Sequence, residues 1–231
     1  MTRCANERET PGTGHDWRPP EGLDTIRIET ARLVVRVFEL DDAPRVFEAV
    51  TASHDHLAPW MDWVEQYKTL DNAYDYVVRQ RLRMKDLRES RAVGLGMFEK
   101  GSGRFVGGHG FHGLHLDTAA AEFGYWVRQD ANGSGFATEA SRHVVSYLLR
   151  PQAEGGLGLR RARAYCSSEN IGSRRVLEKA GLPLEVCQRG DIFAKGLDRT
   201  TDRLGYGITA DEWDCVGHRP LPGTPTTRLP A

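Results

Sequence analysis

The sequence predicts one mixed α/β domain built around a largely antiparallel sheet, and three observations support this. The chain has 231 residues, a length that suits a single folded core with short extensions. Hydrophobic residues make up 39% of it, which is sufficient for a packed interior. Residues 91–129 contain three β-rich segments separated by glycine-rich turns, a pattern typical of an antiparallel meander.

The first part of this domain is expected to begin with strands and to continue with two helices. The segment "TIRIETARLVVRVFEL" (25–40) is rich in β-branched residues. Asp41 or Asp42 can then cap a helix over residues 43–50. A second amphipathic helix is predicted over residues 69–90, from the spacing of its apolar positions.

The second part is expected to contain the meander and then alternating helices and strands. The predicted ranges are 91–100, 104–113 and 119–129 for the meander strands, 135–150 for a helix, 160–168 for a strand, 170–181 for a helix capped by Asn170, and 183–194 and 202–213 for two closing strands.

Both ends of the chain are expected to be flexible tails. Residues 1–24 and 215–231 are rich in proline, glycine and polar side chains, so neither segment can bury much apolar surface. The folded domain is therefore predicted to occupy residues 25–214.

Composition and charge argue against several classes of function. The formal net charge is -1, so the chain lacks the basic excess of a nucleic-acid-binding protein. No apolar stretch approaches the roughly 20 residues of a membrane span, and the N-terminal residues lack the apolar core of a secretion signal. The four cysteines are scattered without a CxxC pair, so neither a zinc site nor a disulfide framework is expected. A soluble cytoplasmic protein is predicted.

The segment "DANGSGFATEA" (130–140) is a candidate binding loop. Gly133 and Gly135 stand immediately before a predicted helix. A helix N-terminus presents unpaired N–H groups and a partial positive charge, so glycines here let a phosphate approach the backbone. The same glycines could equally make a tight strand-to-helix turn. No Gly-Lys-Ser/Thr follows, and Thr138 replaces a third glycine, so neither a P-loop nor a dinucleotide-binding fingerprint is present.

Three histidines, His109, His112 and His115, recur at intervals of three in "HGFHGLH". On a strand, an odd spacing places neighbouring side chains on opposite faces. No recognised zinc spacing accompanies them, so no metal site is predicted. One of these histidines could still line an acceptor pocket or act as a base.

Five segments follow one another in an order and spacing that is specific in combination. They are "IETARLVVRVFELDDAPRVFEAV", "LAPWMDW", "AEFGYWV" with "NGSGFATEA", "NIGSRRVLEKAGL" and "DRLGYGITADEW". From about residue 26 to residue 213, the sequence thereby resembles the GNAT superfamily of acetyl-CoA-dependent N-acetyltransferases, and specifically its RimJ/RimL-like branch. The resemblance implies a GNAT fold: a mostly antiparallel, V-shaped central α/β sheet with flanking helices, whose two middle strands splay apart to admit the pantetheine arm.

The resemblance also implies that amides of the glycine loop hold the pyrophosphate of coenzyme A. In this family the loop reads Arg or Gln, two variable residues, Gly, one variable residue, then Gly or Ala. Gly135 and Ala137 occupy the last two positions, but Asn132 stands where Arg or Gln is usual. The residues expected to contact acetyl-CoA are Trp126, Val127, Arg128, Asn132, Gly133, Ser134, Gly135, Phe136, Ala137, Thr138, Asn170 and Arg175.

Acetyl transfer to an amine needs a group that takes the proton of the amine and, usually, an acid for the departing thiolate. The resemblance assigns the first role to Glu122, in a strand that carries a bulge and lines the cleft in this family; alternation alone would equally allow a surface glutamate. Ser173 occupies the position at which RimJ/RimL-like enzymes are thought to protonate the thiolate. Many other GNAT enzymes have a tyrosine where this chain has Leu177, so either Ser173 or solvent is expected to supply that proton.

The acceptor side of the cleft is expected to include Trp60, Trp63 and His112, although core packing would equally account for either tryptophan. The predicted function is transfer of an acetyl group from acetyl-CoA to a primary amine, on a protein N-terminus or a small molecule. A small-molecule enzyme of biosynthesis or antibiotic resistance is one alternative, and a non-catalytic acyl-CoA-binding module is another. An exposed edge of the meander could mediate a homodimer.

Overall fold

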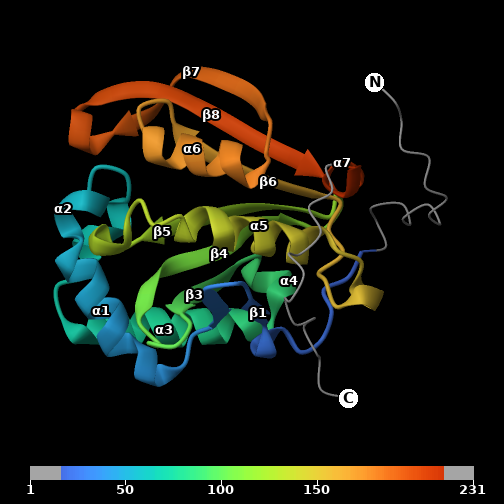
Figure 1. Ribbon diagram of the computed structural model, residues 1–231, viewed down its shortest axis with the longest axis horizontal. Helices are drawn as coiled ribbons and strands as arrows, with labels where there is room; N and C mark the ends of the chain where they lie inside the picture. The colour runs from blue at the N-terminus through green and yellow to red at the C-terminus, as the bar shows by residue number, and fades with distance from the viewer. Residues whose placement is uncertain (1–16, 216–231) are drawn as a thin grey trace.

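The computed structural model describes residues 17–215, and within them the chain forms an eight-stranded sheet with helices on both faces (Figure 1). The strand order is β1-β2-β3-β4-β5-β6-β8-β7, and every neighbouring pair is antiparallel except β5 and β6. The strands are β1 Arg27–Glu29, β2 Leu33–Val37, β3 Val93–Glu99, β4 Phe105–His115, β5 Ala120–Val127, β6 Arg161–Ser167, β7 Leu184–Ala194 and β8 Arg199–Thr209. The prediction of a mostly antiparallel α/β sheet is confirmed.

The sheet opens between its two parallel strands. β5 and β6 pair only over residues 120–122 and 161–163. Beyond that point β5 continues to Val127 along β4, while β6 continues to Ser167 along β8. Figure 1 shows the result: β6, β8 and β7 lie with α6 above the blue and green N-terminal strands and helices. The splayed, V-shaped sheet expected from the resemblance is therefore present.

Two separate cores lie on the two faces of the sheet. Consecutive strand residues alternate between them: Met97 belongs to the core beneath α5, whereas Phe98 belongs to the core beneath α1 and α3. Val106 and Phe105 divide in the same way. The helices are α1 Ala43–Ala52, α2 His54–Leu57, α3 Leu70–Lys85, α4 Leu87–Ser90, α5 Phe136–Leu149, α6 Ile171–Ala180 and α7 Ala210–Cys215. None of them, within the described range, has the length and hydropathy of a membrane span.

The start of α1 differs from the sequence-based expectation. Asp42 precedes the helix but makes no side-chain capping bond to it. Its carboxylate instead accepts a hydrogen bond from the Glu39 amide at 2.8 Å and pairs with Arg36 at 2.7 Å. A charge-assisted bond to a guanidinium is stronger than a neutral cap, so Asp42 fixes the turn between β2 and α1.

The long second helix is interrupted once. Asp86 is extended, with φ of -141°, and its carboxylate accepts from the Glu89 amide at 3.0 Å. An aspartate used in this way starts a new helix instead of continuing the old one. The helix expected over 69–90 is therefore two helices, α3 and α4.

The last predicted strand is too long at its C-terminal end, because β8 ends at Thr209 and α7 begins at Ala210. The Thr209 hydroxyl accepts from the Glu212 amide at 3.3 Å, and the Glu212 carboxylate accepts from the Thr209 amide at 2.9 Å. This reciprocal pair is a capping box.

Part of the expected N-terminal tail contacts the domain. The Trp17 indole donates to the Leu157 carbonyl at 3.0 Å, and Leu23 is buried in the core beneath α5. Apolar burial therefore anchors residues 17–24 to the sheet. The rest of that segment and nearly all of the C-terminal one lie outside the described residues.

Candidate active site

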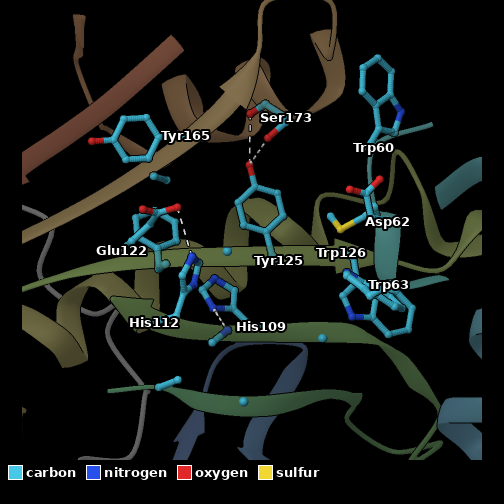
Figure 2. A pocket seen from close by; sticks show the side chains of 18 of the residues that line it. Trp60, Asp62, Trp63, His109, His112, Glu122, Tyr125, Trp126, Tyr165 and Ser173 are labelled. Atoms are coloured by element: carbon cyan, nitrogen blue, oxygen red, sulfur yellow. Dashed lines mark hydrogen bonds and ion pairs between the residues drawn. The ribbon is translucent and has the colours of Figure 1, made fainter. Parts of the chain in front are cut away.

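A cavity of about 790 Å³ lies where β5 and β6 part, between α3 and α6. Figure 2 shows that side chains from distant segments of the chain converge on it. The structure brings seven of the predicted site residues into its lining: Trp60, Trp63, His112, Glu122, Trp126, Asn170 and Ser173.

Glycines form a row across the floor of the cavity. Gly94 of β3 lies opposite Gly110 of β4, which lies opposite Gly124 of β5. A methyl group on Gly94 would collide with the Gln80 side chain of α3, and one on Gly110 would collide with the Val93 carbonyl. Gly110 therefore cannot carry a side chain in this register, because the obstacle is backbone, whereas a methyl group on Gly124 would make only an ordinary contact with His112.

Glu122 projects from β5 beside His112 of β4, with 3.2 Å between the carboxylate Oε1 and the imidazole Nε2 (Figure 2). The Glu122 side chain is 26% exposed and that of His112 is 57% exposed, so both are accessible from the cavity. The register shifts between His112 and His115, which places the extra residue on β4. The bulge expected on the strand of Glu122 is therefore on the neighbouring strand, immediately after His112.

Ser173 is held by a residue that sequence reasoning missed. The Tyr125 hydroxyl donates to the Ser173 carbonyl at 3.1 Å and lies 3.0 Å from the Ser173 hydroxyl, which is left to act as donor. Burial raises the pKa of the Tyr125 phenol, so it stays protonated. In Figure 2, Tyr125 extends from β5 to Ser173 across the opening of the sheet. The two residues are 48 positions apart, and nothing in the local sequence around either one signals this contact.

Asn170 stands at the junction of β6 and α6. Its side-chain oxygen accepts from the Ser173 amide at 3.0 Å, so it caps α6, as its position before the helix predicts. The cap also fixes the backbone of Ser173.

His109 is buried beneath the cavity and does not serve as an exchangeable base. Its Nδ1 accepts from the Gly110 amide at 2.8 Å, and its Nε2 lies 3.2 Å from the Ser141 hydroxyl of α5. Burial lowers its pKa to about 3, so the ring is neutral at physiological pH. Of the described residues, no three His, Cys, Asp or Glu side chains are grouped so that they could hold a metal ion.

Aromatic residues form one wall of the cavity, and the loop after β7 borders it. Trp63 packs against Trp126, with ring centroids 5.6 Å apart. Asp62 pairs with Lys195 at 2.8 Å, and Gly196 contacts Pro59 closely enough that any side chain on Gly196 would collide with it. These contacts join the segment around Trp60 to the loop that follows β7.

The glycine loop lies outside the lining of this cavity, at the N-terminus of α5. Gly133 and Gly135 have φ of 77° and 82°, and a side chain on Gly133 would meet only open space. Gly135 precedes α5 and offers no capping side chain, so the first amides of the helix, at Phe136, Ala137 and Thr138, have no carbonyl within the helix to bind. These positions fit an anion contact.

A cation that sequence reasoning missed stands beside this loop. Arg32, from the turn between β1 and β2, donates to the Ser134 carbonyl at 2.9 Å and pairs with Glu139 at 2.7 Å. Asn132 offers no charge, and its side-chain oxygen accepts from the Gly133 amide. The turn before β2 carries no pattern that predicts this contact.

Three other predicted cofactor residues are placed apart from the cavity. Val127 pairs with Gly107 within the sheet. The Arg128 guanidinium is buried and binds Glu48 at 2.7 Å and Asp130 at 2.6 Å, so its side chain is committed to the structure. Arg175 is exposed on α6 and does not line the cavity.

Comparison with known proteins agrees with this geometry. The family model described as "Acetyltransferase (GNAT) domain" matches residues 32–183. "Putative ribosomal N-acetyltransferase YdaF" of Bacillus subtilis (strain 168) is 26% identical over 183 residues, which cover 79% of this chain and 93% of that protein.

Solved structures share the fold at low identity. RimL, a ribosomal L7/L12 alpha-N-protein acetyltransferase in complex with coenzyme A, has a TM-score of 0.69 at 19% identity, covering 81% of this chain and 99% of RimL. The microcin C7 self-immunity acetyltransferase MccE, in complex with acetyl-CoA and AMP, has a TM-score of 0.66 at 16% identity, covering 78% of this chain and 93% of MccE. Because the family model spans more than half of the 231 residues, the chain belongs to the GNAT acetyltransferase family.

Proposed function

We propose that this chain transfers the acetyl group of acetyl-CoA to a primary amine by direct attack, with Glu122 as the base and Ser173 as the acid. One observation carries the proposal. A carboxylate from β5 and a hydroxyl from α6 line the same cavity, at the point where β5 and β6 part. An amine and a thioester that meet there would have a proton acceptor and a proton donor within the same cavity.

The amides of Phe136, Ala137 and Thr138 would hold the pyrophosphate of coenzyme A, with Gly133 and Gly135 leaving room for it. Arg32, which is paired with Glu139, holds the same loop in place through its hydrogen bond to the Ser134 carbonyl. On the β6 side, no strand among residues 17–215 pairs with the edge of β5 beyond Glu122, so its backbone can pair with the extended pantetheine arm. Acetyl-CoA supplies the acetyl group as a thioester, and the complexes of RimL and MccE with coenzyme A and acetyl-CoA support its use here.

In the proposed reaction, the amine nitrogen forms a bond to the acetyl carbon and the carbon–sulfur bond breaks. Glu122 takes the proton released by the amine, directly or through water, and His112 orients the carboxylate. An unpaired backbone amide of β5 stabilises the negative charge that develops on the carbonyl oxygen. The Ser173 hydroxyl gives its proton to the thiolate, while the Tyr125 hydroxyl fixes the position of Ser173. Exchange with solvent then removes the proton from Glu122 and returns one to Ser173, so both groups are restored for the next turnover.

The acceptor class is open between a protein N-terminus and a small molecule. RimL is named for a ribosomal protein N-terminus, whereas MccE is a self-immunity enzyme whose complex contains AMP. Both kinds of acceptor are compatible with a cavity of about 790 Å³.

Turnover and binding, measured together, test the proposal against a non-catalytic acyl-CoA-binding module. Wild type, Glu122→Ala and Ser173→Ala are assayed for thiol release with a panel of primary amines, and each is titrated with acetyl-CoA. The proposal expects all three to bind acetyl-CoA and both variants to lose turnover, while Glu154→Ala, a substitution of an exposed glutamate outside the cavity, keeps wild-type turnover. Acetyl-CoA binding with no turnover on any amine would establish the binding module instead.

A further inference from the structure

Part of the cavity, away from Glu122 and Ser173, is lined by hydrogen-bond donors that lack acceptors. Tyr67, Tyr76, Arg79 and Arg83 all line it. Among the residues that the structure describes, neither phenol hydroxyl nor the Arg79 guanidinium has a hydrogen-bond partner. The Arg83 side chain makes one long contact, 3.4 Å to the Gln80 side-chain oxygen. These donors are accessible from the cavity and are available to a ligand that supplies acceptors.

Three of these four residues lie close together because they are on the same helix, α3. Tyr76, Arg79 and Arg83 are separated by three and four residues on α3, so they share one face. Both guanidinium groups act on Tyr76 electrostatically, and Arg79 acts on Tyr67 as well, which places the charges close to the phenols. Burial outweighs them and raises the pKa of Tyr76 to about 12, so its hydroxyl remains a donor at neutral pH.

A continuous aromatic wall joins this cluster to the strand that carries Glu122. Ring centroids are 5.6 Å apart for Trp126 and Trp63, 5.7 Å for Trp63 and Tyr67, and 6.1 Å for Tyr67 and Tyr76. Trp126 belongs to β5, as Glu122 does. One ligand can therefore lie along this wall, with its amine at β5 and its other end at α3.

The charges of the cavity favour an anion at the α3 end. Of its carboxylates, Asp62 is paired with Lys195 at 2.8 Å, and Glu122 is hydrogen-bonded to His112. Asp75 is the remaining carboxylate in the lining and lies on α3 with the two arginines. Arg79 and Arg83 thus outnumber the single carboxylate of Asp75 at this end of the cavity, which leaves one excess positive charge there. Arg79 is exposed and Arg83 is half-buried, so both guanidinium groups are accessible to a ligand.

We propose that Arg79, Arg83, Tyr67 and Tyr76 form a subsite for a carboxylate or phosphate group carried by the amine acceptor. The inference rests on the proposed acetyltransferase function and narrows its substrate class. Guanidinium groups match the planar oxygen pairs of carboxylates and phosphates, and phenol hydroxyls complete the remaining acceptor positions. The acceptor is then an amine at one end and an anion at the other.

Matched pairs of acceptors test the proposal and distinguish the source of the anion. One pair is alanyl-glutamyl-glycinamide and alanyl-glutaminyl-glycinamide, which represents an acidic protein N-terminus. The other is phosphoethanolamine and ethanolamine, which represents a small anionic amine. The kcat/KM of thiol release is measured for each member with saturating acetyl-CoA. In at least one pair, the anionic member is expected to be preferred about tenfold or more, since a charge-assisted hydrogen bond contributes about that factor.

Variants connect any preference to the subsite. The double substitution Arg79→Ala with Arg83→Ala is expected to bring the ratio within the preferred pair close to one. Arg88→Ala, at an exposed arginine outside the cavity, should keep the wild-type ratio. Asp75→Asn should keep it or increase it, because this change removes the one carboxylate on α3 that lines the cavity.

Equal kcat/KM within both pairs would overturn the proposal, as would a preference that survives the double substitution. If no member is turned over, the protein saturated with coenzyme A is titrated with the same four compounds. The subsite is supported if an anionic member of a pair gives binding heat, its neutral partner gives none, and the heat is lost in the double variant. Any other result contradicts it. Failure of the proposed function is distinguishable, because it would appear as absence of acetyl-CoA binding or of turnover on every amine.

Discussion

The side of the cavity formed by β5, β6 and α6 holds polar groups that already bind one another, whereas the side formed by α3 and the aromatic wall holds donors with no acceptor. On the first side, Tyr125 binds Ser173, Asn170 caps the helix that carries Ser173, and Glu122 contacts His112. On the second side, Arg79 and the nearby phenols are unpartnered in the described structure. In the proposed reaction, the fold preorganises the reacting groups on the first side, and in the proposed subsite the acceptor supplies the missing hydrogen-bond acceptors on the second side.

Glu122→Gln should have the largest effect of any single substitution on the preorganised side, because it removes the proton acceptor and leaves the shape of the side chain. We expect kcat for amine acetylation to fall about a hundredfold or more, since a general base contributes at least that much. Steady-state thiol release measures the change. Acetyl-CoA affinity should stay within about twofold of wild type. An unchanged kcat would mean that the base lies elsewhere, and His112→Gln would then be the next variant to assay.

Gly135→Val tests whether the loop before α5 is a preformed part of the acetyl-CoA site. A β-branched residue at φ of 82° is strained by about 2 kcal/mol, so relaxing the loop should weaken acetyl-CoA binding about thirtyfold. Gly101→Val is a matched control, because Gly101 has φ of 83° in the turn after β3. The control should lose similar stability and keep wild-type affinity. Equal loss of affinity in both variants would contradict a specific role for the loop.

The buried His109 makes the stability of the fold sensitive to acid. Its pKa is about 3 in the folded protein against an ordinary value of 6.5, so between these values the unfolded chain binds one more proton at this residue than the folded chain does. Stability therefore falls as pH falls through this range, by about 1.4 kcal/mol between about pH 7.5 and about pH 5.5. Urea unfolding at both values measures the loss, which should be absent in His109→Gln. The same loss in the variant would assign the acid sensitivity to other groups.

Tyr125→Phe should have the smallest effect, because Tyr125 positions the acid and does not contact the thioester in the proposed reaction. Loss of its hydrogen bonds to Ser173 costs about 1 kcal/mol, so kcat should fall roughly fivefold with KM for acetyl-CoA unchanged. Adding Ser173→Ala should lower kcat no further than Ser173→Ala alone. Additive effects of the two substitutions would show that Tyr125 acts independently of Ser173.

The two sides also differ in how far the sequence predicts them. Local patterns predict the meander, the α5 loop and the Asn170 cap, because glycine turns and helix caps depend on neighbouring residues. The capping box of Thr209 and Glu212 is equally local, although the β-rich residues before it favour a longer strand. The Tyr125 contact with Ser173 depends on how far β5 and β6 separate, which no local pattern specifies.

The α3 side is the least predictable from sequence. Residues 69–90 indicate an amphipathic helix, and its arginines are typical of an ordinary solvated face. The role proposed for them depends on the tertiary position of Tyr67 and Trp63, which reach the same cavity from a separate segment. Local sequence therefore cannot distinguish the α3 arginines that line the cavity from those that face only solvent.

The proposed function requires that the open edge of β5 and the α5 loop form an acetyl-CoA site before any acceptor binds. Calorimetric titration of the wild-type protein with acetyl-CoA, without an amine, tests this most directly. We predict saturable binding at a single site, with an affinity in the micromolar range, about -8 kcal/mol, and competition by coenzyme A. Absence of binding at about 1 mM acetyl-CoA, a bound of roughly -4 kcal/mol, would contradict it.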